Sequence, residues 1–230
     1  MDGNTLLEDA KVLANIESPD ALIFDGASVI YSSGNALHRL GGKPVKEYPA
    51  PVTALAISPE GTFAVGLNSG ALIVGRDEIA GFNCPAALAF DGGSLLVCNG
   101  SESFAPDDWV KDLMRRKSSG SVWRFNLATG ERQCLARSLA YPNGIVSDGN
   151  RVVFSESWKH RLSSIASSGG AVTPVLQHLP AYPCRIMPAF DGYLLALFAP
   201  LNRLVEFVLL EDDYREDMMR EIGSRYWGAP

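Results

Sequence analysis

Pro85-Ala86-Ala87-Leu88-Ala89-Phe90-Asp91-Gly92 decides the fold, because versions of this stretch recur along the chain. Each version combines a proline, a short apolar run and a tight turn rich in Asp, Asn and Gly. The other versions contain Pro19, Pro51, Pro142 and Pro183. Consecutive prolines of the series lie 32, 34, 57 and 41 residues apart. A period of this size, built from short apolar segments, is typical of a repeat architecture.

Each repeat continues as β structure after its turn. Second strands are predicted over residues 27–31, 63–67, 94–98, 151–155 and 193–197, and third strands over 36–40, 71–74, 121–126, 162–166 and 204–209. Weaker fourth strands are predicted over 45–48, 131–136 and 172–177. Four antiparallel strands in a repeat of about 40 residues indicate one blade of a β-propeller. Residues 1–230 are therefore expected to form a single all-β propeller domain.

Two segments interrupt the rhythm of the repeats. The third repeat is too long by residues 101–119, where Pro106 and the acidic residues after it predict a helix running through Arg116. Residues 211–223 carry apolar side chains at helical spacing, which predicts an amphipathic helix lying on the propeller. Five repeats are visible. A ring of five blades is allowed, but no strand follows the last helix, so we expect a sixth blade to be missing from this sequence.

Composition narrows the possible partners. The chain has 230 residues, of which 47% are hydrophobic, and a net charge of −6 with no basic cluster. This charge argues against nucleic acid as a partner. No apolar run approaches the roughly 20 residues that a membrane span needs. The polar, acidic start does not resemble a secretory signal, so we expect a cytoplasmic protein, and a signal trimmed from the sequence stays open as an alternative.

The four cysteines form no CxxC pair, which argues against a structural zinc site. Cys84 opens one predicted strand and Cys98 closes the next, so hairpin geometry can bring the two sulfur atoms together. Two readings remain open for this pair: a disulfide bond, or buried free thiols in a reducing compartment.

Repeats three to five contain four segments that resemble one known family. Residues 119–131 are similar to the pattern S-G-R-L-x-x-Y-D-P-x-T-G-E, and Leu139-Ala140-Tyr141-Pro142-Asn143-Gly144-Ile145 is similar to L-x-F-P-N-G-V. Residues 155–161 and 179–193 follow with similar patterns at matching spacing. Together they resemble the strictosidine-synthase-like family, six-bladed propellers related to gluconolactonase, regucalcin and paraoxonase. The end of the chain is most similar to the branch of adipocyte plasma membrane-associated protein and its bacterial relatives.

The resemblance implies six blades around a central channel with a site at the channel mouth. In a propeller the first strand of each blade lines the channel, and the residue after each repeat proline lies near its mouth. These residues are Asp20, Val52, Ala86, Asn143 and Cys184. Relatives that hydrolyse lactones or esters bind a divalent metal through such acids and amides. We therefore expect calcium ligands at Asp20 and Asn143, because calcium takes oxygen ligands.

Further site residues follow from the same placement. Glu156 and Asn143 are the predicted catalytic residues. Asn99 and Glu156 can add oxygen ligands to the calcium site if their side chains turn towards the channel. Each also has a structural reading, in which Asp20 and Asn143 shape turns and Glu156 forms an ion pair with Lys159 or Arg161. The predicted substrate-binding residues are Arg185, Cys184, Asn99 and Trp158.

Cys184 and Arg185 depart from the family, whose calcium-binding members have Asp-Asn or a similar pair at these positions. A guanidinium beside the site weakens a cation site and suits a carboxylate or phosphate ligand.

Three functions remain open. The first is hydrolysis of small esters or lactones, with or without a divalent metal. The second is a propeller that binds a small molecule or a protein without chemistry. The third is condensation of an amine with an aldehyde, for which no residue matches the family's glutamate. The insertion at 101–119 is expected to cover the channel mouth.

Overall fold

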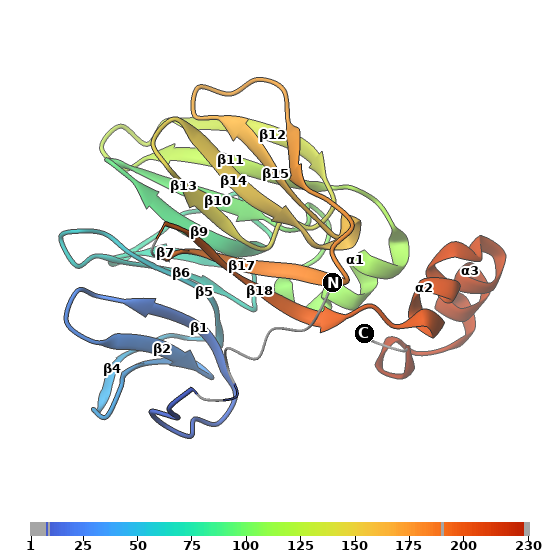
Figure 1. The fold of residues 1–230 in the computed structure, drawn as a ribbon, viewed down its shortest axis with the longest axis horizontal. Helices are drawn as coiled ribbons and strands as arrows, with labels where there is room; N and C mark the ends of the chain where they lie inside the picture. Colours follow the sequence, from blue (N-terminus) through green and yellow to red (C-terminus); the bar gives the residue numbers. More distant parts are fainter. Residues whose placement is uncertain (1–7, 9, 190, 228–230) are drawn as a thin grey trace.

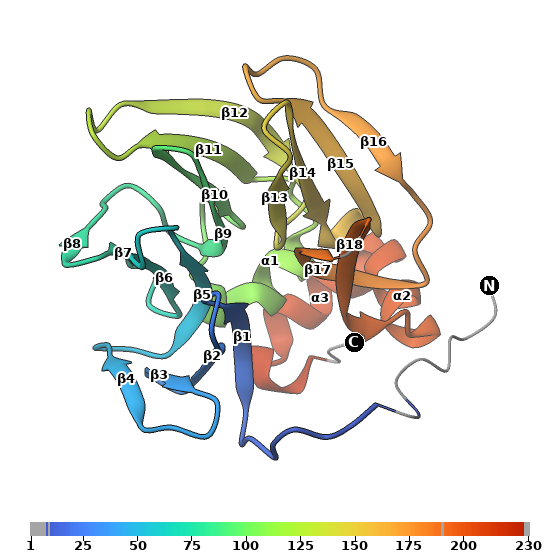
Figure 2. The ribbon, with the colours of Figure 1, turned by 60° about the vertical axis from the view of Figure 1, so that its left-hand side comes forward.

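The computed structural model describes residue 8, residues 10–189 and residues 191–227. These residues form four four-stranded antiparallel sheets, one two-stranded sheet and several short helices (Figure 1). The sheets follow one another around a central axis, one sheet for each repeat (Figure 2). The all-β propeller predicted from the repeats is therefore confirmed. The number of blades in a closed ring stays a prediction.

The first two sheets come from the first two repeats. The first contains β1 (Pro19–Phe24), β2 (Val29–Ser33), β3 (Ala36–Arg39) and β4 (Pro44–Glu47). The second contains β5 (Val52–Ile57), β6 (Phe63–Leu67), β7 (Leu72–Val74) and β8 (Asp77–Glu78). In both sheets the strands pair in chain order, each antiparallel to the one before it. The inner strand of each sheet is thus the one that carries the repeated stretch.

The third and fourth sheets follow the same plan. The third contains β9 (Pro85–Asp91), β10 (Ser94–Asn99), β11 (Gly120–Asn126) and β12 (Arg132–Leu139). The fourth contains β13 (Ile145–Ser147), β14 (Arg151–Glu156), β15 (Arg161–Ala166) and β16 (Thr173–Leu176), with the short 3-10 helix η2 (Ser157–Lys159) between two of its strands. The helix predicted within residues 101–119 is present as η1 (Pro106–Asp108) and α1 (Trp109–Arg115).

The fifth repeat departs from the plan. It has only the hairpin β17 (Ala181–Ala189) and β18 (Gly192–Pro200), followed by α2 (Arg203–Leu210), α3 (Asp212–Glu221) and η3 (Ser224–Tyr226). The strand predicted over residues 204–209 is therefore wrong. The Asn202 side chain caps α2 by accepting a hydrogen bond of 2.9 Å from the Leu204 amide. Val205 and Leu209, one helical turn apart, are its buried residues.

The hydrophobic core lies between neighbouring sheets. The inner strands pack side by side in order, β1 against β5, β5 against β9, β9 against β13 and β13 against β17. Separate buried clusters fill the spaces between consecutive sheets from the first to the fourth. A further cluster joins α1 and α2 through Met114 and Leu209, beside Met218 and Met219 of α3. The C-terminal helices thus pack on the propeller, as the amphipathic pattern predicted.

The ring of sheets is open between β18 and β1 (Figure 2). Apolar side chains are exposed on both sides of this opening: Leu194 is 56% exposed and Leu22 is 51% exposed. Within the described residues β18 pairs only with β17. None of the helices in the described part of the chain has the length and apolar character needed to cross a membrane.

Candidate functional site

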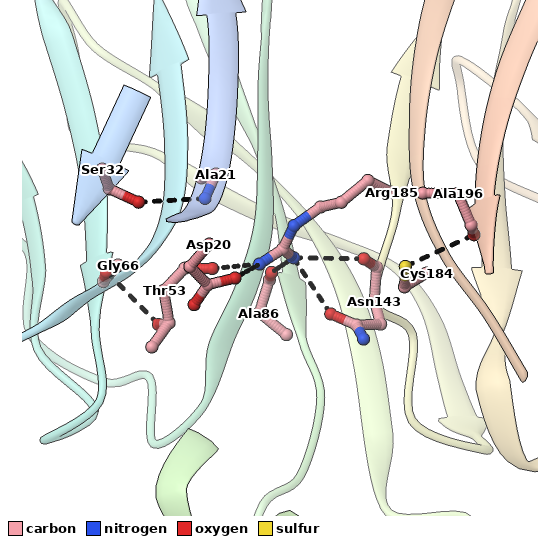
Figure 3. A network of polar contacts seen from close by, with 10 residues as sticks. All are labelled: Asp20, Ala21, Ser32, Thr53, Gly66, Ala86, Asn143, Cys184, Arg185 and Ala196. Carbon is pink, nitrogen blue, oxygen red and sulfur yellow. Dashed lines mark hydrogen bonds and ion pairs between the residues drawn. The ribbon is translucent and has the colours of Figure 1, made fainter. Parts of the chain in front are cut away.

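Four of the inner strands have an irregularity beside their repeat proline. The pairing register of β1, β5, β9 and β17 shifts at Asp20, Thr53, Ala86 and Arg185 respectively. A β-bulge leaves a residue out of the ladder and re-aims its side chain or carbonyl group. The bulges therefore direct polar atoms into the channel at one common level (Figure 3).

The guanidinium group of Arg185 lies in the middle of this level (Figure 3). Its Nη1 donates to Asn143 Oδ1 at 3.0 Å, to the Asn143 carbonyl at 3.3 Å and to the Ala86 carbonyl. Its Nη2 donates to Asp20 Oδ1 at 3.2 Å and to the Thr53 carbonyl. One side chain from the fifth sheet thus contacts residues of all four other repeats.

The structure brings three of the predicted site residues together, namely Asp20, Asn143 and Arg185. Cys184 lies next to them in the chain, but its Sγ donates to the Ala196 carbonyl at 3.3 Å, on the side of β18. Burial raises the pKa of the Cys184 thiol above its ordinary value, which keeps the sulfur protonated at neutral pH. Its predicted contact with substrate stays a prediction.

Glu156 lies apart from this group, at the end of β14. Its carboxylate is fully buried and accepts hydrogen bonds from Arg161, from Ser163 at 2.9 Å and from the Ala140 amide at 3.2 Å. Burial alone would raise the pKa of Glu156, but these hydrogen bonds hold it below the ordinary carboxyl value. The structure gives Glu156 the ion pair of its structural reading, and its catalytic role stays a prediction.

Asn99 and Trp158 also make structural contacts. Asn99 is buried, and its Oδ1 accepts from the Cys84 amide at 2.8 Å and from the Asn83 amide at 3.2 Å. The Trp158 ring stacks on Tyr141 with the ring centres 4.5 Å apart. Neither residue is among the hydrogen-bond partners of Arg185. The predicted contact of Asn99 and Trp158 with a substrate stays a prediction.

An aromatic cluster closes the channel on the α1 side of Arg185. Tyr141 and Ala86 share a buried cluster with Cys84, and Trp109 and Trp158 pack against it. Ala86 contacts both the aromatic cluster and Arg185. Its side chain lies in this cluster, while its carbonyl accepts a hydrogen bond from Arg185. The insertion that carries Trp109 therefore covers this end of the channel.

Asp112 of α1 is a buried carboxyl group in this cover. Its Oδ1 accepts from the Trp158 indole at 2.8 Å. Burial raises the pKa of Asp112 above its ordinary value, while hydrogen bonds from Ser101 and Trp158 work in the opposite direction. Asp112 thereby holds the indole in place over Tyr141.

The cysteines near the cover are free thiols. The Cys84 thiol donates to the Tyr141 hydroxyl across 3.7 Å, and the Cys98 thiol donates to the Gly144 carbonyl across 3.8 Å. Burial raises the pKa of Cys84 to about 11, and that of Cys98 also rises through burial. Of the two readings left open for this pair, the structure has the one with separate buried thiols.

A cavity of about 740 Å³ extends from Arg185 to the far ends of the inner strands. Asp20 and Arg185 lie at one end of it, where the inner strands begin. The walls are mostly apolar and include Leu22, Phe24, Leu55, Leu88, Ile145 and Met187. The channel therefore offers a polar floor and apolar walls.

A calcium ion does not fit among the oxygens around Arg185 on the channel axis. The oxygens that would hold it, Asp20 Oδ1 and Asn143 Oδ1, accept hydrogen bonds from Arg185. Calcium takes six to eight oxygens, whereas here a permanently charged guanidinium occupies the point on which the oxygens converge. Within the described residues no group of three or more His, Cys, Asp or Glu side chains lies close enough to hold a metal ion.

Two of the acceptors around Arg185 have no signal in the sequence. The Thr53 and Ala86 oxygens belong to the backbone, and any residue type supplies them. The usable signal was position in the repeat. Asp20 and Asn143 directly follow a repeat proline, and Arg185 lies two residues after Pro183.

Comparisons with known proteins agree with the fold and the motifs. Residues 88–167 match the family model described as strictosidine synthase. Two proteins of Arabidopsis thaliana are similar over about half of the chain. One, Protein STRICTOSIDINE SYNTHASE-LIKE 6, is 30% identical over 115 residues, which are 49% of this chain and 31% of that protein. The other, Protein STRICTOSIDINE SYNTHASE-LIKE 4, is 29% identical over 120 residues, which are 51% of this chain and 32% of that protein.

The matched region thus spans about a third of the length of these relatives. Among solved structures, a chain from the crystal structure of a nidogen/laminin complex superimposes with a TM-score of 0.67 at 15% identity, covering 84% of this chain and 78% of that one. This likeness supports the fold alone. The resemblance to the strictosidine-synthase-like family is confirmed, and the closer branch stays a prediction.

Proposed function

We propose that this strictosidine-synthase-like propeller chain binds a small, largely apolar molecule in its central channel. The single observation that carries the proposal is the cavity of about 740 Å³, which has apolar walls and Arg185 and Asp20 at its floor. Ligand pockets are of this size and are lined mainly by apolar side chains with a few polar groups that fix orientation. The cavity wall supplies binding energy in proportion to the apolar surface that it covers.

The floor sets the orientation of the ligand. The charge of Arg185 is already shared among acceptors from four repeats, so the guanidinium is not free to form a bidentate pair with an anion. A neutral group with a polar end suits this floor better than a carboxylate or phosphate. The anionic ligand expected from the sequence is therefore not the one we propose.

Binding of a neutral naphthylamine dye, followed by fluorescence, tests the proposal. Leu22 lines the cavity and Leu204 of α2 lies outside it, and both side chains are at least half exposed, at 51% and 70%. Leu22→Glu places a charge on the cavity wall and is expected to weaken dye binding at least 10-fold, because an unpaired charge is costly beside apolar surface. Leu204→Glu is the matched control and is expected to leave binding unchanged.

Equal weakening by the two substitutions, or no saturable binding to the unmodified chain, would contradict the proposal. A panel of small neutral esters, lactones and alcohols that compete with the dye then ranks the ligand classes.

Hydrolysis of small esters or lactones is the second candidate, and one observation favours it. The cavity floor holds both a carboxylate and a guanidinium, because Asp20 Oδ1 and Arg185 Nη2 lie 3.2 Å apart there. A carboxylate can act as a general base towards water. The positive charge of the guanidinium can favour the negative charge that develops on an ester oxygen without forming a bidentate pair with it. Condensation of an amine with an aldehyde has no comparable observation among the described residues.

The hydrolytic candidate is tested with chromogenic aryl esters and lactones. Asp20→Asn keeps an oxygen facing Arg185 but removes the base, so turnover is expected to fall at least about 100-fold while dye binding is retained. Asp217→Asn on the exposed face of α3 is the control and should leave turnover unchanged. Dye binding without turnover in the unmodified chain leaves ligand binding as the function and removes hydrolysis.

A further inference from the structure

The oxygen atoms around Arg185 have the chemical character of a cation site. Five of them accept hydrogen bonds from the guanidinium: two side-chain oxygens, from Asp20 and Asn143, and three carbonyl oxygens, from Thr53, Ala86 and Asn143. Carboxylates, amide oxygens and backbone carbonyls are the ligands that hard divalent cations take. Figure 3 shows them converging from separate repeats on one point.

Two of the five oxygens are placed by strand pairing rather than by the arginine. The carbonyls of Thr53 and Ala86 lie at register shifts of β5 and β9, where the ladder passes from Val52 to Ala54 and from Pro85 to Ala87. β1 shifts at the same level, between Pro19 and Leu22. Because bulges of this kind re-aim the residue that they leave unpaired, the oxygens would face the axis without a guanidinium as well.

We propose that Arg185 is a built-in cation: its guanidinium occupies an oxygen cage that would otherwise take a divalent metal ion. The group is held by the chain itself and stays charged at every accessible pH. It also joins β17 to the residues of the four preceding repeats. The guanidinium therefore joins the inner strands at the axis of this propeller without a metal. The cage is a latent calcium site, which would become available if the guanidinium were removed.

Charge decides between the two occupants. Asp20 is the one carboxylate among the acceptors of Arg185, and its negative charge is balanced by the guanidinium. A calcium ion at the same point would face a fixed positive charge at contact distance, and like charges repel strongly where water is excluded. Without the guanidinium, the same carboxylate, amide and carbonyls are left unpaired and attract a cation.

Calcium titration of the full chain, followed by calorimetry and thermal unfolding, tests the proposal. The unmodified chain and the charge-preserving variant Arg185→Lys are expected to bind no calcium. The melting temperature of each should be the same with and without calcium. Arg185→Asn, which replaces the cation with a further amide oxygen, is expected to gain a calcium-dependent rise of about 5 °C or more at saturating calcium. The double variant Arg185→Asn/Asn143→Ala removes a cage oxygen and is expected to lose most of this rise.

Two results would overturn the inference. One is a calcium ion bound by the unmodified chain with an affinity that Asn143→Ala reduces, since the cage would then hold a metal despite Arg185. The other is a folded Arg185→Asn variant whose melting temperature ignores calcium. If Arg185→Asn folds only when calcium is present, that rescue supports the inference. If it fails to fold in both conditions, the cage does not persist without the guanidinium, and the latent site is refuted.

Discussion

Two buried carboxyl groups, Glu156 and Asp112, differ in what surrounds them. Glu156 accepts charged and neutral hydrogen bonds that lower its pKa despite its burial. Asp112 has no cationic partner among its hydrogen bonds, and burial dominates to raise its pKa. The two groups therefore contribute to stability with opposite dependence on pH, because the sign follows the direction of each shift.

Glu156→Gln is expected to destabilise the chain by about 3 kcal/mol, because it leaves the Arg161 guanidinium without its buried counter-charge. The pKa of Glu156 is lowered in the folded state, so its stabilisation is present above the ordinary value of 4.5 and is lost as the pH falls below it. Urea unfolding at pH 7 and at pH 4 measures both effects. The gap between the parent and the variant should narrow at pH 4, and a gap that is unchanged would contradict the ion pair.

Asp112→Asn is expected to behave in the opposite way. The raised pKa means that the folded state favours the protonated carboxyl, so the cost of burying the charge grows as the pH rises through that pKa. Asparagine keeps an oxygen for the Trp158 indole and carries no charge. The variant should have an equal or higher urea midpoint than the parent at pH 8, with the difference shrinking at low pH. A clear loss of stability at pH 8 would show that the charge itself is needed.

At the scale of elements, the close approach of neighbouring inner strands explains one residue of the family-like motif. The Asn143-Gly144 pair suggested a turn as its structural reading, yet Gly144 has no positive φ. A Cβ at Gly144 would lie 1.8 Å from the Cys184 carbonyl of β17. Glycine is therefore required here by the contact between the fourth and fifth sheets.

Gly144→Ala is expected to cost at least about 2 kcal/mol, because the methyl group would push β17 away and backbone atoms cannot yield like a flexible side chain. Gly93→Ala is the matched control, since a Cβ at Gly93 meets nothing within 4 Å, and its backbone needs no positive φ. Chemical denaturation of both variants gives the comparison. Similar losses for the two glycines would contradict the inter-sheet contact.

The sequence predicted most strands because alternation and turn chemistry are local properties. Residues 63–67, for example, were predicted as a strand and form β6 with the same bounds. It failed at residues 204–209, where a short apolar run fits a buried strand or a helix equally well, and the Asn202 cap decides for helix. Asp20, Asn143 and Arg185 were found through their position beside the repeat prolines. The roles of the Thr53 and Ala86 carbonyls depend on bulges, which pairing with the neighbouring strand creates.

At the scale of the whole molecule, each sheet is stabilised mainly by its neighbours in the ring. The third sheet packs against buried clusters on both of its faces. The fifth sheet shares the small cluster of Val146, Val153 and Ile186 with the fourth, and its Tyr182 packs edge-to-face on Trp158. β18 lies at the open side of the ring with most of its residues exposed. Local stability should therefore fall from the middle of the ring to the fifth sheet.

Native-state hydrogen exchange followed by mass spectrometry measures this gradient. Peptides covering β10 should exchange slowest, and peptides covering β18 at least about 10-fold faster, because local opening of a two-stranded sheet exposes little buried apolar surface. Arg185 adds a second, specific expectation, since its hydrogen bonds tie the fifth sheet to the other repeats. Arg185→Lys keeps the charge but has fewer donors, so it should speed exchange in β17 and β18 while leaving β10 unchanged. Equal protection of β10 and β18, or acceleration spread evenly over all five sheets, would show that the ring opens as one cooperative unit and that Arg185 does not act as a tie between sheets.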